Sequence, residues 1–260
     1  AVTDHGDMFG IKEFFNYVQK VKGKNKDKAA ECEARIAALR DGTEACADPA
    51  AEIAKCEKQL AECKRRLAFK PIIGCEVYVS PGSRFDRETV HGEDRYYHLV
   101  LLAENNTGYQ NLMKIVSKGF VEGFYYKPRV DMEVLEKYHE GIIALSACLA
   151  GEVQKYLVRG MYEEAVRAAR RYEGIFGRGN FFLELQDHGI PEQKAVNTQL
   201  LRMSKETGID LVATNDVHYT YASDADSHDI LLCLQTGKKL SDTDRMRYEG
   251  GQYFVKYPEE

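Results

Sequence analysis

Carboxylate, histidine and cysteine side chains stand at places along this 260-residue chain where strands are expected to begin or end. The densest group is Asp216-Val217-His218, in which two potential metal ligands are two residues apart. Alternate residues of an extended chain point to the same side, so Asp216 and His218 are expected to face one point while Val217 faces away. A carboxylate oxygen and an imidazole nitrogen presented together suit a divalent metal ion.

Further residues could join this pair, although each alone has an ordinary structural explanation. His5 lies in a polar turn, where it could be a surface histidine, and Glu76 lies within an apolar stretch, where it could form a salt bridge across the sheet. His98 begins an apolar run, and Cys148, which could be a buried inert thiol, follows an expected strand. A buried carboxylate is costly unless it is paired or bound to metal. Together these nitrogen, oxygen and sulfur ligands favour Zn²⁺, Mn²⁺ or Fe²⁺ over Mg²⁺ alone.

The elements that must position these residues alternate between short apolar stretches and amphipathic ones. This alternation predicts an α/β fold with a mainly parallel sheet or barrel. The expected strands are Pro71–Ser80, Tyr97–Ala103, Gly141–Ser146, Asn180–Gln186 and Asp210–Asn215. The expected helices are Phe9–Val21, Gly108–Phe120, Tyr162–Phe176, Glu192–Thr207 and Ala222–Gln235.

His98 conflicts with an all-parallel arrangement. Ligands gather at the carboxyl ends of parallel strands, whereas His98 stands at the amino end of its strand. We therefore expect Val77–Ser80 and Tyr96–His98 to form a short antiparallel extension above the barrel.

The segment Lys22–Ala68 interrupts the alternation, because it is rich in Ala, Glu, Lys and Arg and carries no strand pattern. Asp41-Gly42 predicts a break, and Asp48 followed by Pro49 predicts a new helix start. Apolar residues spaced three and four apart form a helical seam on the second half: Ile53, Cys56, Leu60, Cys63 and Leu67. We interpret residues 22–69 as an inserted antiparallel helical hairpin. A zinc site formed by Cys32, Cys46, Cys56 and Cys63 is the less favoured alternative, because the spacing lacks the usual C-x₂-C pair.

Composition narrows the class of protein. The formal net charge is −5, from 36 Lys and Arg against 41 Asp and Glu, so this chain by itself is expected to bind DNA weakly. Its seven cysteines are unevenly spaced, which favours a reduced cytoplasmic protein over a disulfide framework. No apolar run long enough for a membrane span and no secretory leader is evident, and no membrane partner is expected.

Several long motifs resemble the PHP domain of the α subunit of bacterial DNA polymerase III. The resemblance covers nearly the whole chain except the hairpin. Its motifs are Thr-Asp-His-Gly at 3–6, Pro-Ile-Ile-Gly-Cys-Glu-Val-Tyr-Val at 71–79, His-Leu-Val-Leu-Leu-Ala at 98–103, Glu-Gly-Phe-Tyr-Tyr-Lys-Pro-Arg at 122–129, Leu-Ser-Ala-Cys-Leu-Ala-Gly-Glu at 145–152, Glu-Leu-Gln-Asp-His-Gly at 184–189, Ala-Thr-Asn-Asp-Val-His-Tyr at 213–219 and Leu-Leu-Cys-Leu-Gln-Thr-Gly-Lys at 231–238.

The resemblance implies a distorted (β/α)7 barrel that binds up to three metal ions. It implies the metal ligands His5, Glu76, His98, Cys148, Asp216 and His218. Glu76 is the expected bridging ligand, and Glu76, Asp216 and His218 are the expected catalytic residues. Arg129, Lys127 and Glu184 are weaker candidates for holding phosphate or supporting the ligands, with surface salt bridges as the alternative.

The family site also uses an amino-terminal His-x-His and an aspartate that do not precede Ala1. We therefore expect residues 1–260 to be an N-terminally truncated PHP domain that lacks the first strand, with partial metal occupancy and little or no nuclease activity by itself.

The resemblance also implies a function for the parent protein. That protein would be a DNA-directed DNA polymerase, itself dependent on Mg²⁺, whose PHP site acts as a 3′→5′ exonuclease on DNA 3′ ends with Zn²⁺ or Mn²⁺. Its partners would be the other subunits of the polymerase III holoenzyme. Two alternatives remain at this stage: a structural module that stabilises the polymerase and contacts partner subunits, and a free-standing phosphomonoesterase.

Overall fold

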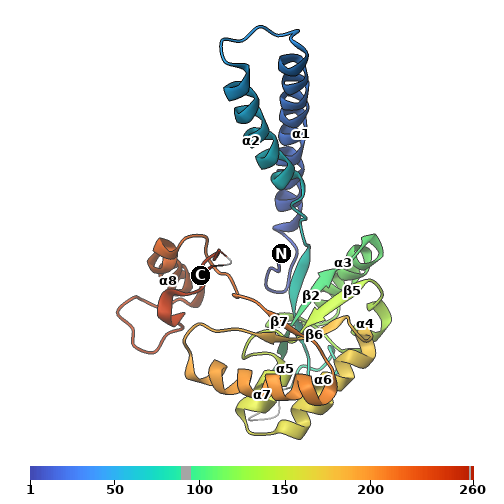
Figure 1. Cartoon of the computed structure of the whole chain (residues 1–260). Coiled ribbons are helices and arrows are strands. Elements are labelled where there is room, and N and C mark those ends of the chain that lie inside the picture. Colours follow the sequence, from blue (N-terminus) through green and yellow to red (C-terminus); the bar gives the residue numbers. More distant parts are fainter. Residues whose placement is uncertain (89–94, 258) are drawn as a thin grey trace. The chain divides into compact units, whose positions relative to one another are not determined.

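A computed structural model describes residues 1–88, 95–257 and 259–260 (Figure 1). The chain forms two compact units, the first made of residues 1–4 and 8–73 and the second of residues 5–7 and 74–260. The expected insertion at 22–69 thus lies inside a unit that begins earlier in the chain.

The first unit is built on the helices α1 (Ile11–Asp41) and α2 (Pro49–Leu67) (Figure 1). Gly42 ends α1 in a left-handed conformation with φ 77°, and the Asp48 side chain accepts a hydrogen bond from the Ala51 amide at the start of α2. Both boundaries were predicted. The separate helix expected at Phe9–Val21 is wrong, because α1 is one helix of 31 residues. A lone Gly23 costs a helix only about 1 kcal/mol, which does not end it among strong helix formers.

The facing sides of α1 and α2 form an apolar seam. Cys56 is 4% exposed and Cys63 is 2% exposed, and on α1 Cys32, Ile36 and Leu39 are also buried. Nowhere in the described part of this hairpin do three metal-binding side chains converge. The cysteines therefore act here as small apolar residues.

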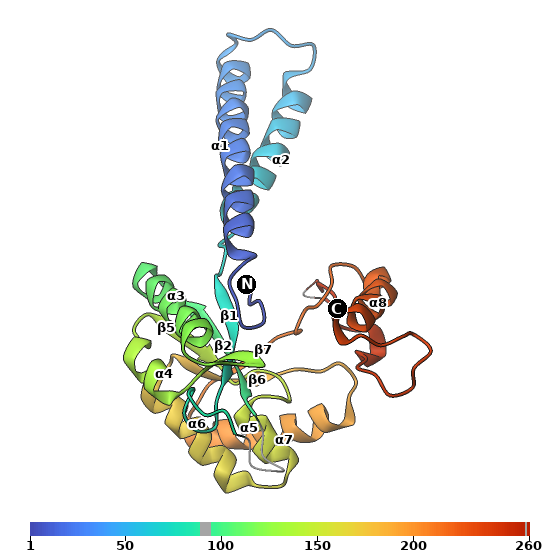
Figure 2. The ribbon, with the colours of Figure 1, turned by 180° about the vertical axis from the view of Figure 1, so that it is seen from behind.

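The second unit contains a seven-stranded sheet with the order β3-β4-β1-β2-β5-β6-β7. Its strands are β1 (Gly74–Val79), β2 (Tyr97–Ala103), β3 (Phe124–Tyr125), β4 (Lys127–Val130), β5 (Ile142–Leu145), β6 (Phe181–Leu185) and β7 (Leu211–Ala213). Its helices are α3 (Asn106–Val121), α4 (Met132–Tyr138), α5 (Glu152–Val158), α6 (Tyr162–Phe176), α7 (Pro191–Thr207) and α8 (Ala225–Thr236), with 3₁₀ turns at Ala222–Asp224 and Glu249–Gly251. Figure 2 shows α5, α6 and α7 gathered along one side of the strands.

The sheet is mixed, and β2 runs opposite to both of its neighbours. It pairs with β1 from Gly74↔Leu102 to Val79↔Tyr97 and with β5 from Val100↔Leu145 to Ala103↔Ile142. The expected antiparallel extension at Val77–Ser80 was therefore too short, because the whole of β1 takes part. The described residues between the strands, 80–88 and 95–96, form no helix that could return the chain for parallel pairing.

The α/β class is confirmed, whereas the closed (β/α)7 barrel stays a prediction. Among the described residues the strand order ends at β3 and β7. The core between strands and helices is apolar, with Leu99, Leu101, Leu112, Ile142 and Leu183 almost fully buried. In the part of the chain that the structure describes, none of the helices combines the length and the apolar character of a membrane span.

Candidate metal centre

His5, Glu76 and His98 come together at one point of the second unit. Their potential ligand atoms all lie within 4.8 Å of one another. The Nδ1 atom of His5 is 2.8 Å from Glu76 Oε1, and the Nδ1 atom of His98 is 2.7 Å from the same oxygen. Three residues predicted from separate motifs thus form one cluster.

His5 reaches the cluster because residues 5–6 run beside β1. The Gly6 amide donates a hydrogen bond of 2.8 Å to the Glu76 carbonyl. Gly6 has φ +73°, and a Cβ added there would lie 2.6 Å from the Tyr78 ring. Glycine is therefore required at this position, both for its backbone conformation and for the close approach to β1.

The cluster holds a carboxylate between two imidazole groups. Glu76 is 4% exposed, and burial alone would raise the pKa of its carboxyl group. The hydrogen bonds with His5 and His98 outweigh burial and lower the Glu76 pKa to about 2. The same contact with Glu76 raises the pKa of His5. The carboxylate is therefore ionised, as a metal ligand must be, and it is surrounded by groups that compensate its negative charge.

Cys148 and His218 extend the cluster on two sides. Cys148 Sγ lies 3.6 Å from His98 Nδ1, and His218 Nε2 lies 3.3 Å from His5 Nε2. Burial raises the pKa of the Cys148 thiol, and the carboxylates of Glu76 and Asp216 raise it further. The thiol is therefore neutral unless a cation compensates the thiolate charge.

The turn that carries Asp216 and His218 has an unusual backbone. Asp216 has φ +43°, in the left-handed region that residues other than glycine seldom adopt. The His218 Nδ1 atom donates to the Asp216 carbonyl over 2.7 Å, which leaves Nε2 facing His5 as the ligand atom. Val217 is 49% exposed. Asp216 and His218 follow the end of β7 and Asp216 is not extended, so the alternation expected of an extended chain does not apply here. Burial raises the pKa of Asp216, and His218 opposes this effect.

The direction of β2 explains how these residues meet. Because β2 is antiparallel to β5, its amino end with His98 lies beside the carboxyl end of β5, which is followed by Cys148. Of the other candidates, Glu76 lies within β1, His5 forms a bridge beside it, and Asp216 and His218 follow β7. His5, Glu76 and His98 could hold a divalent metal ion. The preference for Zn²⁺, Mn²⁺ or Fe²⁺ stays a prediction.

Glu184 connects the segments that precede Cys148 and Asp216 by hydrogen bonds. Its buried carboxylate accepts hydrogen bonds from the Ala147 amide at 3.0 Å and from the Thr214 hydroxyl at 2.5 Å. Ala147 precedes Cys148, and Thr214 precedes the Asp216 turn. Burial raises the pKa of Glu184, while Thr214 and Gln186 oppose this effect by donating hydrogen bonds. Its predicted role in supporting the ligands stays a prediction.

Lys127 and Arg129 differ in where their charges lie. The Lys127 ammonium is 5.4 Å from the Tyr78 ring, which is itself 5.3 Å from the His98 ring, so Lys127 stands at the edge of the cluster. Arg129 is 2% exposed, and its guanidinium donates to backbone carbonyls, among them those of Arg84 and Gly123. Lys127 therefore lies near the predicted site, whereas the Arg129 guanidinium is used in hydrogen bonds to the backbone.

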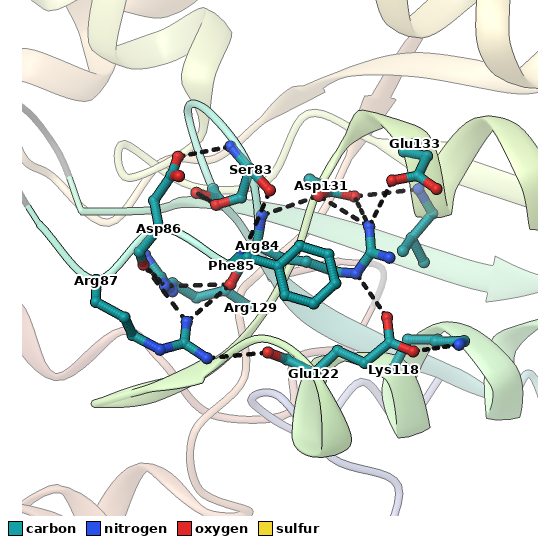
Figure 3. A network of polar contacts seen from close by, with 12 residues as sticks. Ser83, Arg84, Phe85, Asp86, Arg87, Lys118, Glu122, Arg129, Asp131 and Glu133 are labelled. Carbon is teal, nitrogen blue, oxygen red and sulfur yellow. Dashed lines mark hydrogen bonds and ion pairs between the residues drawn. The ribbon is translucent and has the colours of Figure 1, made fainter.

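Arg129 belongs instead to a polar network around Arg84 (Figure 3). The Arg84 guanidinium is bonded to Asp131 at 3.0 Å, to Glu122 at 2.8 Å and to Glu133 at 2.9 Å. Asp131 also accepts from the Val134 amide and so caps α4. These hydrogen bonds connect Arg84, in the segment after β1, to the end of α3 and the start of α4.

Sequence reasoning missed an aromatic group beside His218. The Tyr248 ring lies 4.4 Å from the His218 ring, His228 lies 5.6 Å from it, and Tyr253 lies 5.7 Å from it. His188 stacks on Tyr253 at 3.8 Å. The position of His188 just after an expected strand was a signal of the kind used for the ligand candidates, whereas nothing in the local sequence marked the tyrosines.

Comparison with known proteins identifies the family of the chain. Residues 1–188 match the family model of the PHP domain. The DNA polymerase III subunit alpha of Treponema pallidum is 49% identical over 100% of this chain and 18% of its own length. The proteins of the same name from Deinococcus radiodurans and Campylobacter jejuni are each 40% identical over 100% of this chain, covering 16% and 18% of their lengths. The chain thus spans less than a fifth of these relatives, and it belongs to the PHP domain family.

Proposed function

We propose that this chain is the PHP domain of a replicative DNA polymerase III α subunit and that its metal centre hydrolyses phosphodiester bonds at DNA 3′ ends. The observation that carries the proposal is the convergence of His5, Glu76 and His98 within 4.8 Å. The similarity to DNA polymerase III α subunits supports the choice of DNA as substrate.

The residues that would hold divalent ions are His5, Glu76, His98, Cys148, Asp216 and His218. Such ions supply Lewis acidity toward a phosphate oxygen and lower the pKa of water. Glu76 would be the bridging ligand, and the contacts of one of its oxygens with both histidines support this choice. Lys127 adds a positive charge at the edge of the cluster, where it can orient a phosphate.

The rest of the parent protein would provide most of the affinity for DNA. The net charge of −5 gives this chain little attraction for DNA phosphates. It would therefore act on a DNA 3′ end that other parts of the parent protein bind. From the similarity to DNA polymerase III α subunits, we also propose that the other subunits of the polymerase III holoenzyme are its partners.

A structural role is the second candidate, and α8 is the observation that favours it. Leu231 is 60% exposed and Leu234 is 74% exposed on this helix. A neighbouring region of a longer polymerase could cover these side chains. In this case ligand substitutions would lower the melting temperature of the polymerase and leave any nuclease activity unchanged.

The deciding experiment uses the complete polymerase that contains this domain, with 5′-labelled single-stranded DNA and either Mn²⁺ or Zn²⁺. We expect the unaltered protein to release nucleotides from the 3′ end and the double variant Asp216→Ala, His218→Ala to lose that release. The exposed Asp226→Ala serves as the matched control. Equal release by the double variant and the unaltered protein would reject the nuclease and favour the structural role.

A further inference from the structure

His188 is a buried histidine in the turn between β6 and α7 that none of the ligand motifs uses. It is 3% exposed. Its Nε2 atom is 2.9 Å from the Asn215 carbonyl oxygen, and its Nδ1 atom is 2.9 Å from Gln193 Nε2. Both ring nitrogens are therefore engaged within the protein, so His188 is not a metal ligand here.

The partners fix which nitrogen carries the proton. A carbonyl oxygen can only accept, so Nε2 of His188 must donate to Asn215. The Gln193 side chain has a fixed orientation, because its oxygen accepts from the His188 backbone amide at 2.8 Å and its nitrogen therefore faces Nδ1. The ring is held in place by Tyr253, with an interplanar angle of 11°. His188 is thus a neutral Nε2–H donor with a fixed ring plane.

The His188 Nε2–H group donates to the peptide unit that joins Asn215 to Asp216. The Asn215 carbonyl belongs to the peptide plane whose rotation about the next N–Cα bond defines φ of Asp216, which is +43°. Relaxing φ to negative values would turn that carbonyl away from His188 and move the Asp216 carboxylate with it. A left-handed φ at a residue other than glycine persists where surrounding contacts hold it, and the hydrogen bond from His188 is one such contact.

Residues 252–254 connect the Asn215 position to His218 by hydrogen bonds. The Asn215 side-chain amide donates to the carbonyls of Gln252 and Phe254, and the His218 amide donates to the Tyr253 carbonyl at 2.8 Å. Tyr253 therefore stacks on His188 with its ring and holds His218 with its backbone.

We propose that His188 is a positioning residue whose Nε2–H holds the Asn215 carbonyl, so that Asp216 and His218 face the metal together. This inference rests on the proposed function in one respect only, that Asp216 and His218 bind a divalent metal ion. It predicts an effect on metal affinity that is separate from the stability of the fold.

The test is zinc titration of the chain in competition with a chromophoric chelator. His188→Phe keeps the ring on Tyr253 and removes the donor, and we expect it to bind Zn²⁺ roughly 10- to 100-fold more weakly. His188→Gln can place an amide N–H near the position of Nε2 and should bind within a few-fold of the unaltered protein. His139→Phe, at an exposed histidine, is the matched control. The melting temperatures of the metal-free proteins show whether folding has changed.

The outcomes separate this inference from the proposed function. If the unaltered chain binds Zn²⁺ and His188→Phe binds it equally well, only the positioning role fails. If neither binds Zn²⁺, the metal centre fails as well. If His188→Phe does not fold, nitrogen NMR of the imidazole in the unaltered chain decides, because the inference requires Nε2 to be protonated and Nδ1 to be unprotonated. An Nδ1-protonated ring would overturn it.

Discussion

His98 Nδ1 lies 2.7 Å from Glu76 Oε1 although the two residues stand on strands that run in opposite directions. His98 is opposite Tyr78, and Glu76 is opposite Val100, so the two side chains are diagonal neighbours on the same face of the sheet. The reversed direction of β2 is therefore what brings a histidine from the start of one strand to a carboxylate in the middle of another.

Replacing His98 by Ala should weaken zinc binding and also destabilise the metal-free chain. The buried Glu76 carboxylate would lose one of its two histidine contacts, and an unsatisfied buried polar group costs about 1–3 kcal/mol. Urea unfolding in the presence of a chelator measures the free energy of unfolding. His139→Ala, at an exposed site, should leave it unchanged, and an unaltered unfolding curve for His98→Ala would contradict the contact with Glu76.

Glu184→Ala should destabilise the chain and weaken its zinc binding together. The substitution leaves the Ala147 amide and the Thr214 hydroxyl without their acceptor, at a cost of about 1–3 kcal/mol for each buried group. Glu184→Gln keeps one acceptor oxygen and should lose less. Thermal unfolding and zinc titration check both effects, with the exposed Glu163→Ala as control. Normal zinc affinity in Glu184→Ala would show that Glu184 does not support the ligand turns.

Arg84→Met should be among the most destabilising single changes in the second unit. It leaves the buried Asp131 carboxylate without its ion pair, and breaking a buried pair in this way costs roughly 3–5 kcal/mol. Adding Asp131→Asn removes the unpaired charge and should restore part of the loss. Arg167→Met breaks an exposed pair with Glu164 and should cost less than about 1 kcal/mol. Equal unfolding free energies for Arg84→Met and Arg167→Met would rule out a stabilising role for the network.

Cys63→Ser should reduce the stability of the hairpin without changing zinc stoichiometry. Cys63 is 2% exposed in the apolar seam, where an unpartnered hydroxyl costs roughly 1–3 kcal/mol. Cys46→Ser, in the less buried loop between the helices, is the matched control. Helical circular dichroism during thermal unfolding reports the first effect and zinc content the second. Loss of one zinc ion in Cys63→Ser would instead support the hypothesis of a zinc site in the hairpin.

Local patterns predicted much of the fold and the site, because they record burial and spacing. Asp216 and His218 were recognisable from their two-residue spacing, and Glu76 from the cost of a carboxylate in an apolar strand. The antiparallel pairing of β2 was predicted from the position of His98, but only for 77–80 and 96–98, since strand periodicity itself is the same in both directions. Arg129 was misplaced because a charge near a motif says nothing about which way its side chain turns. The role of His188 depends on the carbonyl of Asn215, a contact that only the folded chain reveals.

Anomalous diffraction at the zinc edge, from crystals of the chain grown with Zn²⁺, tests the metal centre most directly. The account predicts a peak among His5, Glu76 and His98, with ligand distances of roughly 2.0–2.3 Å, and loss of ordered metal near His218 in the Asp216→Ala, His218→Ala variant. Zinc bound only elsewhere, with no peak at these side chains, would contradict it.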